Sequence, residues 1–130
     1  MDRAAPFVVG GYLYDKDRSP LYSLEKSDDP MERRTAIVST YYFIRKKDID
    51  DTFKIGRILV QDKDDYVQKA VGSWIREAGK QNHSKLIEFL DGNGAIMPRI
   101  MLRYAIEKLN SSTRQYYLDA KKMGFNGSHV

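Results

Sequence analysis

Cationic side chains recur on one face of a helix that the sequence predicts over residues 65–80. The row, at steps of four, three and four residues, comprises Lys69, Ser73, Arg76 and Lys80. Residues at these steps share one helical face. A cationic row with a small polar residue in it suits a phosphate backbone better than a small metabolite. This face is therefore the first candidate for a binding surface.

The opposite face of the same helix is apolar. Its members recur at three- and four-residue steps: Val67, Ala70, Val71, Trp74, Ile75 and Ala78. Such a stripe packs a helix on its neighbours and turns the cationic row outward. Because Trp74 lies at the centre of the stripe, we interpret it as a packing residue, with partial exposure at a binding cleft as the alternative.

Three further arginines stand near predicted helix starts. Arg34 lies where the helix dipole disfavours a cation, so we expect an anion to stabilise it. A surface ion pair with Glu32 or with the Asp28–Asp29 loop is the alternative. Arg99 and Arg103 are one turn apart and could hold successive phosphates, or else be solvated or paired with carboxylates.

Composition sets the bounds for these candidates. The 130 residues contain 22 Lys and Arg against 18 Asp and Glu, a formal charge of +4, which gains meaning only because the cations are grouped. Cysteine is absent, and the histidines are His83 and His129, so a metal centre or a Ser-His-Asp site is not expected. The sequence predicts neither a membrane span nor a signal peptide, which favours a cytoplasmic protein.

The elements that position these side chains all read as helices, and no segment alternates long enough for a strand. Before residues 65–80, helices are predicted over Phe7–Leu13, from Ser19–Pro20 to about Lys26, from Asp29–Pro30 to about Lys46, and after a cap at Asp48 or Asp50. After residues 65–80, one helix is predicted from Asn82 to a glycine termination at Asp91–Gly94. A further helix starts at Pro98, and the last runs from a Ser111–Ser112 cap to about Met123. Pairs of about 35 residues are typical of an α-solenoid. We therefore expect an all-α domain over residues 1–123, followed by a flexible tail over 124–130.

Several ordered blocks carry a family resemblance. They are Asp2–Leu13, Glu32–Ile37, Gln68–Gly72, Arg76–Lys80, and Met97–Arg99 with Leu102–Ala105. In this order and spacing the blocks resemble the DNA alkylation repair (AlkD-like) family. The resemblance covers nearly all of the chain and corresponds to the C-terminal part of the family's length, so we expect the family's N-terminal repeats to be lacking.

The resemblance implies an array of HEAT-like antiparallel helix pairs that grips duplex DNA, especially alkylated DNA, in a basic concave groove. Active members of the family are DNA glycosylases that hydrolyse the N-glycosidic bond of N3- or N7-alkylated purines in base excision, without a cofactor. They do so without flipping the base into a tight pocket, unlike most glycosylases. In a bacterium such a protein would associate with the nucleoid.

The resemblance also assigns roles to residues. Asp2 is similar to the catalytic aspartate, which stabilises the sugar's oxocarbenium charge and positions water. Arg34 is similar to the groove arginine, and Lys69 and Arg76 fall on the basic DNA-facing helix. With the row and the arginine pair, the predicted DNA-binding set is Arg34, Lys69, Ser73, Arg76, Lys80, Arg99 and Arg103.

Two positions depart from the family pattern. Active members have a tryptophan where this chain has Ser73, and Trp74 lies one step later, about 100 degrees around the helix. A second groove tryptophan precedes the aspartate, where this sequence has only Met1. Two readings follow: a glycosylase, or a catalytically inactive HEAT-repeat scaffold that binds protein or structured nucleic acid. A truncated chain, a decayed copy or a misassigned start would each explain the missing segment, and a repeat face left uncapped there is expected to self-associate.

Overall fold

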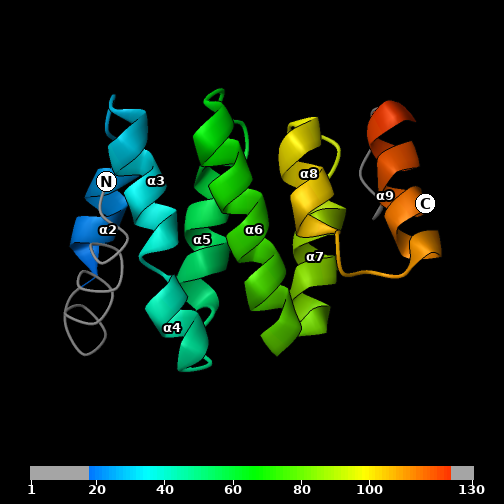
Figure 1. Cartoon of the computed structure of the whole chain (residues 1–130), viewed down its shortest axis with the longest axis horizontal. Helices are drawn as coiled ribbons and strands as arrows, with labels where there is room; N and C mark the ends of the chain where they lie inside the picture. The colour runs from blue at the N-terminus through cyan, green and yellow to red at the C-terminus, as the bar shows by residue number, and fades with distance from the viewer. Residues whose placement is uncertain (1–17, 124–130) are drawn as a thin grey trace.

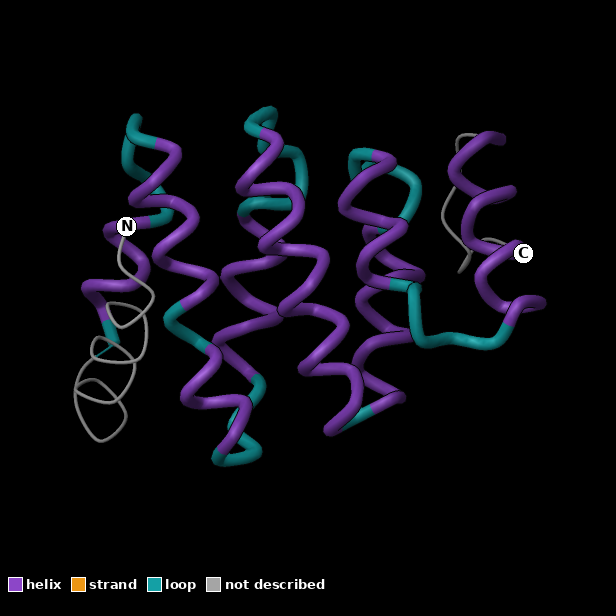
Figure 2. Tube along the Cα trace, in the orientation of Figure 1, coloured by secondary structure: helices purple, strands orange, loops and turns teal. Residues whose placement is uncertain are grey.

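The computed structural model describes residues 18–123, all of whose regular structure is helical (Figures 1 and 2). The helices are α2 (Ser19–Leu24), α3 (Pro30–Val38), α4 (Tyr41–Arg45), α5 (Asp50–Ile58), α6 (Asp65–Gln81), α7 (His83–Asn93), α8 (Arg99–Ala105) and α9 (Ser111–Met123). The predicted all-α class is confirmed. The helix predicted over Phe7–Leu13 and the tail predicted over 124–130 lie outside the described residues, as does Asp2.

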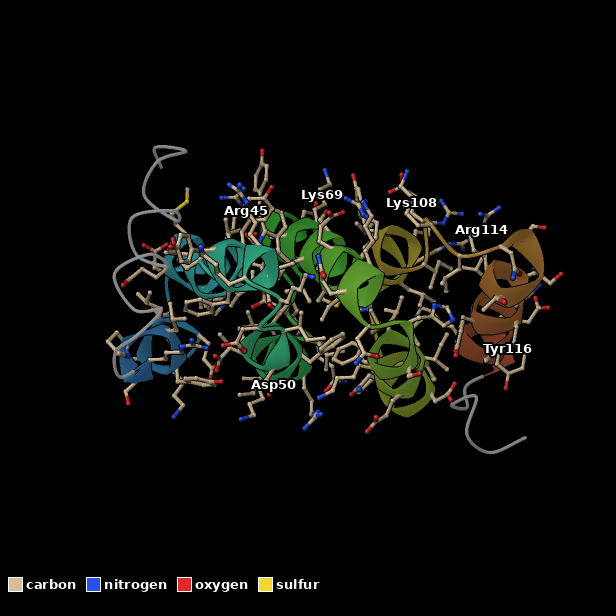
Figure 3. All side chains as sticks on the ribbon, turned by 90° about the horizontal axis from the view of Figure 1, so that it is seen from below. Arg45, Asp50, Lys69, Lys108, Arg114 and Tyr116 are labelled. Atoms are coloured by element: carbon tan, nitrogen blue, oxygen red, sulfur yellow. The ribbon has the colours of Figure 1, made fainter. Side chains whose placement is uncertain are left out.

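The helices form a row two layers deep. Figure 3 shows α3, α6 and α8 in one layer, with α2, α5 and α7 in the other. Helix α6 packs on α3 and α8 within its layer and on α5 and α7 across the layers, so it is the centre of the array. This arrangement fits the predicted α-solenoid, whereas the HEAT-like pairing stays a prediction.

The core lies between the layers, and α6 supplies its middle. The stripe residues Val67, Ala70, Val71, Ile75 and Ala78 are buried, as predicted. Gly72 lets α8 approach closely, because a Cβ atom on this residue would lie 2.5 Å from the Met101 carbonyl oxygen and 2.7 Å from Tyr104 Cβ. The spacing of α6 and α8 therefore depends on the missing side chain.

Side-chain caps begin α3, α6 and α7. The Asp29 carboxylate accepts from the Met31 N–H at 2.9 Å, and the side-chain oxygen Oδ1 of Asn82 accepts from the Lys85 N–H at 3.1 Å, as the predicted helix starts require. The Asp64 carboxylate accepts from the first turn of α6. These bonds satisfy backbone donors that otherwise have no partner within the helix.

The helix predicted from Pro30 to about Lys46 is wrong in its length. It stops at Val38 and resumes as α4 at Tyr41. The Thr40 hydroxyl donates to the Ile37 carbonyl oxygen at 2.6 Å, a local bond that competes with the helical ladder. The result is a bend that separates α3 from the aromatic residues of α4.

Two predicted N-caps differ, whereas one predicted helix end is confirmed. Neither Asp48 nor Asp50 caps α5, which follows Ile49, because Asp48 accepts from Arg18 instead. Helix α7 ends at Asn93 with Gly94 as its C-cap, as predicted for Asp91–Gly94, and Gly94 has right-handed torsion angles. Asn110 provides the cap predicted for Ser111–Ser112, since its side chain accepts from the Thr113 N–H at 2.9 Å.

Partly buried polar contacts join α2 and its N-cap Arg18 to α5. The Asp51 carboxylate accepts from the Arg18 guanidinium at 2.5 Å and from the Tyr22 hydroxyl at 2.5 Å. Burial, followed by the bond to Asp51, raises the pKa of Tyr22.

Among residues 18–123, no helix combines the length and apolarity that a bilayer crossing requires.

Candidate functional site

Several cationic side chains lie along one side of the array. Figure 3 shows Arg45, Lys69, Lys108 and Arg114 along this side, whereas Asp50 lies on the opposite side. They come from α4, α6, the segment after α8, and α9. We call this side the cationic face. Grouped positive charge raises the local concentration of anions far more than the formal charge of the whole chain suggests.

The cationic row of α6 divides into two halves. Lys69 is exposed and makes no ion pair within residues 18–123, and its Nζ atom lies 5.9 Å from the centre of the Tyr66 ring. Ser73 is half-buried in the middle of the row. The first half of the row thus presents an unneutralised cation beside an aromatic ring.

The second half of the row is neutralised by carboxylates. Arg76 donates from Nη1 to Glu107 at 2.6 Å and from Nε to Glu77 at 3.1 Å, and Lys80 Nζ lies 3.1 Å from Glu77. Burial opposes the charged form of Glu77, but the bonds and charges of Lys80 and Arg76 outweigh it and lower its pKa. This four-residue ion-pair cluster leaves little charge for an external phosphate.

A groove of about 470 Å³ runs between the N-terminal ends of α3 and α6. It is lined by Asp29, Pro30, Met31, Arg34, Asp64 and Tyr66. Arg34 is half-buried there and, among the described residues, has no ion pair. The expected alternative partners do not hold it: Glu32 accepts from Ser27, and Asp29 caps α3.

The neighbouring arginine makes the ion pair instead. Arg33 binds Asp62 through two nitrogens, Nε at 2.7 Å and Nη2 at 3.3 Å, and donates to the Ser27 carbonyl oxygen at 3.0 Å. These bonds tie α3 to the turn before α6. The structure therefore separates a fold-holding arginine from one that faces a groove.

Tyr66 is the groove residue that sequence reasoning missed. Its side chain is 73% exposed, and beside it Met31 is 45% exposed. The available signal was its spacing, since Tyr66 precedes Lys69 by three residues and Ser73 by seven and so shares their side of α6. An exposed ring beside Arg34 and Lys69 gives the groove an aromatic surface between cations.

Arg99 and Arg103 lie apart from this groove, at the other end of the layer. Both are exposed on α8 and face α9 across a cleft of about 550 Å³, which Gln115, Asp119 and other α9 residues also line. Neither arginine makes an ion pair within residues 18–123. The predicted site residues are thus distributed over the groove, the row and this cleft.

Trp74 packs inward, in keeping with its place in the apolar stripe. Its indole N–H donates to the Val38 carbonyl oxygen at 3.1 Å, and its ring centre lies 5.8 Å from that of Tyr41. This bond fixes the ring against the end of α3 and the start of α4. Trp74 therefore does not replace an aromatic side chain at Ser73.

Residues 18–123 thus form an all-α array, and the cationic face runs along one of its sides. A family model described as DNA alkylation repair enzyme matches residues 1–109. The chain belongs to this family, which supports a role in DNA alkylation repair and suggests DNA as a partner. No curated protein and no solved structure matches the chain.

Proposed function

We propose that this protein binds duplex DNA along its cationic face and acts in the repair of alkylated DNA. The observation that carries the proposal is the pair of uncompensated cations, Arg34 and Lys69, on the neighbouring helices α3 and α6. A duplex presents phosphates at regular spacing, and cations on adjacent elements can neutralise them together. Tyr66, between the two cations, supplies apolar contact to the sugar.

The reaction that fits this role is hydrolysis of the N-glycosidic bond of an N3- or N7-alkylated purine. The positive charge of such a base weakens its bond to deoxyribose. The purine leaves with the electron pair of that bond, water adds to C1′, and the water proton passes to solvent. Asp2 is the proposed carboxylate that stabilises the developing cation of the sugar and orients the water.

DNA binding is tested first by charge reversal on the cationic face. We expect Arg34→Glu with Lys69→Glu to weaken binding to an undamaged duplex by at least tenfold at about 0.1 M salt and to reduce the salt slope by about 2. Lys54→Glu is the matched control, because Lys54 is an exposed cation of α5, in the other layer. Equal losses in both proteins would refute the assignment of the face.

Catalysis is tested by release of free base from duplexes that contain N7-methylguanine or N3-methyladenine. We expect release by the wild-type chain and none by Asp2→Asn. If a folded protein binds DNA but releases no base, glycosylase activity is excluded for this chain, and Ser73, in place of an aromatic wall, explains the loss. That outcome favours the inactive scaffold.

A further inference from the structure

The cleft between α8 and α9 concentrates positive charge at the end of the array. Its lining consists of Arg99, Arg103, Gln115, Leu118, Asp119, Lys121 and Lys122. Four of these side chains are cationic and one is a carboxylate. Like charges that face one another across a cleft repel, unless an anion lies between them.

The cleft's own residues leave this charge largely uncompensated. The Asp119 carboxylate accepts from Gln115 Nε2 at 2.9 Å, and no ion pair joins it to a cation within residues 18–123. Within the described residues, Lys121 Nζ donates to the Ala95 carbonyl oxygen, at 3.5 Å, and makes no ion pair. The contrast with the ion-pair cluster of Arg76 is direct, because there every cation has a carboxylate within 3.1 Å.

Helix α9 is anchored so that the cleft has two walls. The Tyr117 hydroxyl donates to Asp91 at 2.7 Å, and the Arg114 guanidinium donates to the Leu109 carbonyl oxygen at 2.7 Å. Tyr117 and Ala120 are buried. These contacts leave Gln115, Asp119 and Lys122, which follow one helical side, to face α8.

The two walls have different relations to the family. The family match ends at residue 109, so it includes α8 and does not include α9. The α9 wall, which carries Lys121 and Lys122, is therefore supplied by a part of the chain beyond the matched region. A site that needs both walls is an addition to whatever the matched region does.

We propose that the α8–α9 cleft is a phosphate-binding site, which takes backbone phosphates of the duplex beyond the part held at Arg34 and Lys69. This inference rests on the proposed function. Guanidinium groups bind phosphodiester oxygens through paired N–H donors, and the lysines add mobile point charges from the opposite wall. The cleft extends the contact with DNA along the array.

The test compares neutral variants of the two walls in the full chain. The α8 variant is Arg99→Gln with Arg103→Gln, the α9 variant is Lys121→Gln with Lys122→Gln, and the third combines all four changes. Binding to a duplex of roughly 20 base pairs, two helical turns, is measured by fluorescence anisotropy over a range of salt. Lys54→Gln with Arg57→Gln is the control, because both residues are exposed cations of α5.

We expect each wall variant to lose about fivefold in affinity and the combined variant about tenfold, because removing one wall already empties a shared site. Losses no larger than those of the control would overturn the proposal, and so would losses that multiply fully. If inorganic phosphate binds the wild type but not the combined variant, while the wall variants leave DNA affinity unchanged, the site binds free phosphate and the proposal also fails.

The outcomes separate this inference from the proposed function. If Arg34→Glu with Lys69→Glu weakens DNA binding and the wall variants do not, the cleft proposal fails while the proposed function stands. If the wild-type chain binds no duplex, both fail. Circular dichroism and thermal unfolding of every variant identify those that no longer fold, and single substitutions Arg103→Gln and Lys122→Gln then replace them.

Discussion

Arg76 and Arg103 lie on adjacent helices of one layer, but within residues 18–123 only Arg76 is neutralised by carboxylates. Arg76 is bound by Glu77 and Glu107, whereas Arg103 has no ion pair among the described residues and faces further cations across a cleft. Position on a basic helix therefore does not decide whether an arginine is available to a ligand. Its availability depends on which carboxylates the tertiary structure places beside it.

The largest expected effect comes from forcing α6 and α8 apart. Gly72→Ala would place a Cβ atom against the Met101 carbonyl group, and we expect it to lower the free energy of unfolding by about 1–3 kcal/mol. It would also loosen the Arg76–Glu107 pair, whose partners flank this contact. Thermal or urea unfolding measures the loss. Gly92→Ala is the control, since no described atom lies within 4 Å of its added Cβ, and a similar loss there would contradict the packing argument.

Removing the carboxylates of Glu77 and Glu107 tests whether ion pairing keeps Arg76 from binding DNA. In Glu77→Gln with Glu107→Gln, Arg76 and Lys80 lose their partners and become available to phosphates. We expect duplex affinity to rise by about three- to tenfold at low salt, with a salt slope steeper by about 1. Glu88→Gln, an exposed carboxylate of α7, controls for overall charge. Unchanged affinity would show that DNA does not reach this end of α6.

Single truncations compare an unpaired cation, Lys69, with a paired one, Arg76. Lys69→Ala should reduce the salt slope of DNA binding by about 1, because it removes one phosphate contact. Arg76→Ala should change the slope little, since its charge is already compensated by Glu77 and Glu107. Affinity titrations at several salt concentrations decide between them, and an equal reduction in both variants would contradict the assignment.

The smallest effect is a pH dependence of stability from the ion-pair cluster. The folded-state pKa of Glu77 is lowered by Lys80 and Arg76 against the effect of burial. An acid with a lowered folded-state pKa contributes stability above its ordinary value of 4.5, and this contribution is lost as the pH falls through the folded-state value. Below pH 4.5 the wild type should therefore lose this contribution to its unfolding free energy, whereas Glu77→Gln, which lacks the carboxyl, should show no corresponding loss. Parallel curves for both proteins would show that the cluster does not couple to folding.

Local patterns in the sequence were sufficient for much of the fold. The apolar stripe of α6 and the caps at Asp29 and Asn82 depend on spacing within one helix, and the structure confirms them. The break at Thr40 was missed because a hydroxyl competing for a carbonyl oxygen changes no apolar spacing. The sequence predicts which face a residue occupies better than where its helix stops.

The candidate site was less accessible from sequence, because its chemistry depends on distant partners. Glu107 lies 31 residues from Arg76, so no local pattern could show that the second half of the row is neutralised. The wall that Lys121 and Lys122 add to Arg103 likewise appears only in the tertiary structure, where α9 lies across the cleft from α8. Exposure of Tyr66 is a tertiary property as well, since tyrosine is equally common in packed positions.

Trp74 gives this protein a built-in optical reporter. It is the only tryptophan among 130 residues, and its indole N–H is bound to the carbonyl oxygen that ends α3. Tryptophan fluorescence therefore comes from a single site, next to Ser73 in the sequence. This site lies where α6 contacts α3, the two helices that form the groove. A shift in emission wavelength on adding a ligand would report movement at that junction, without any dye attached to the chain.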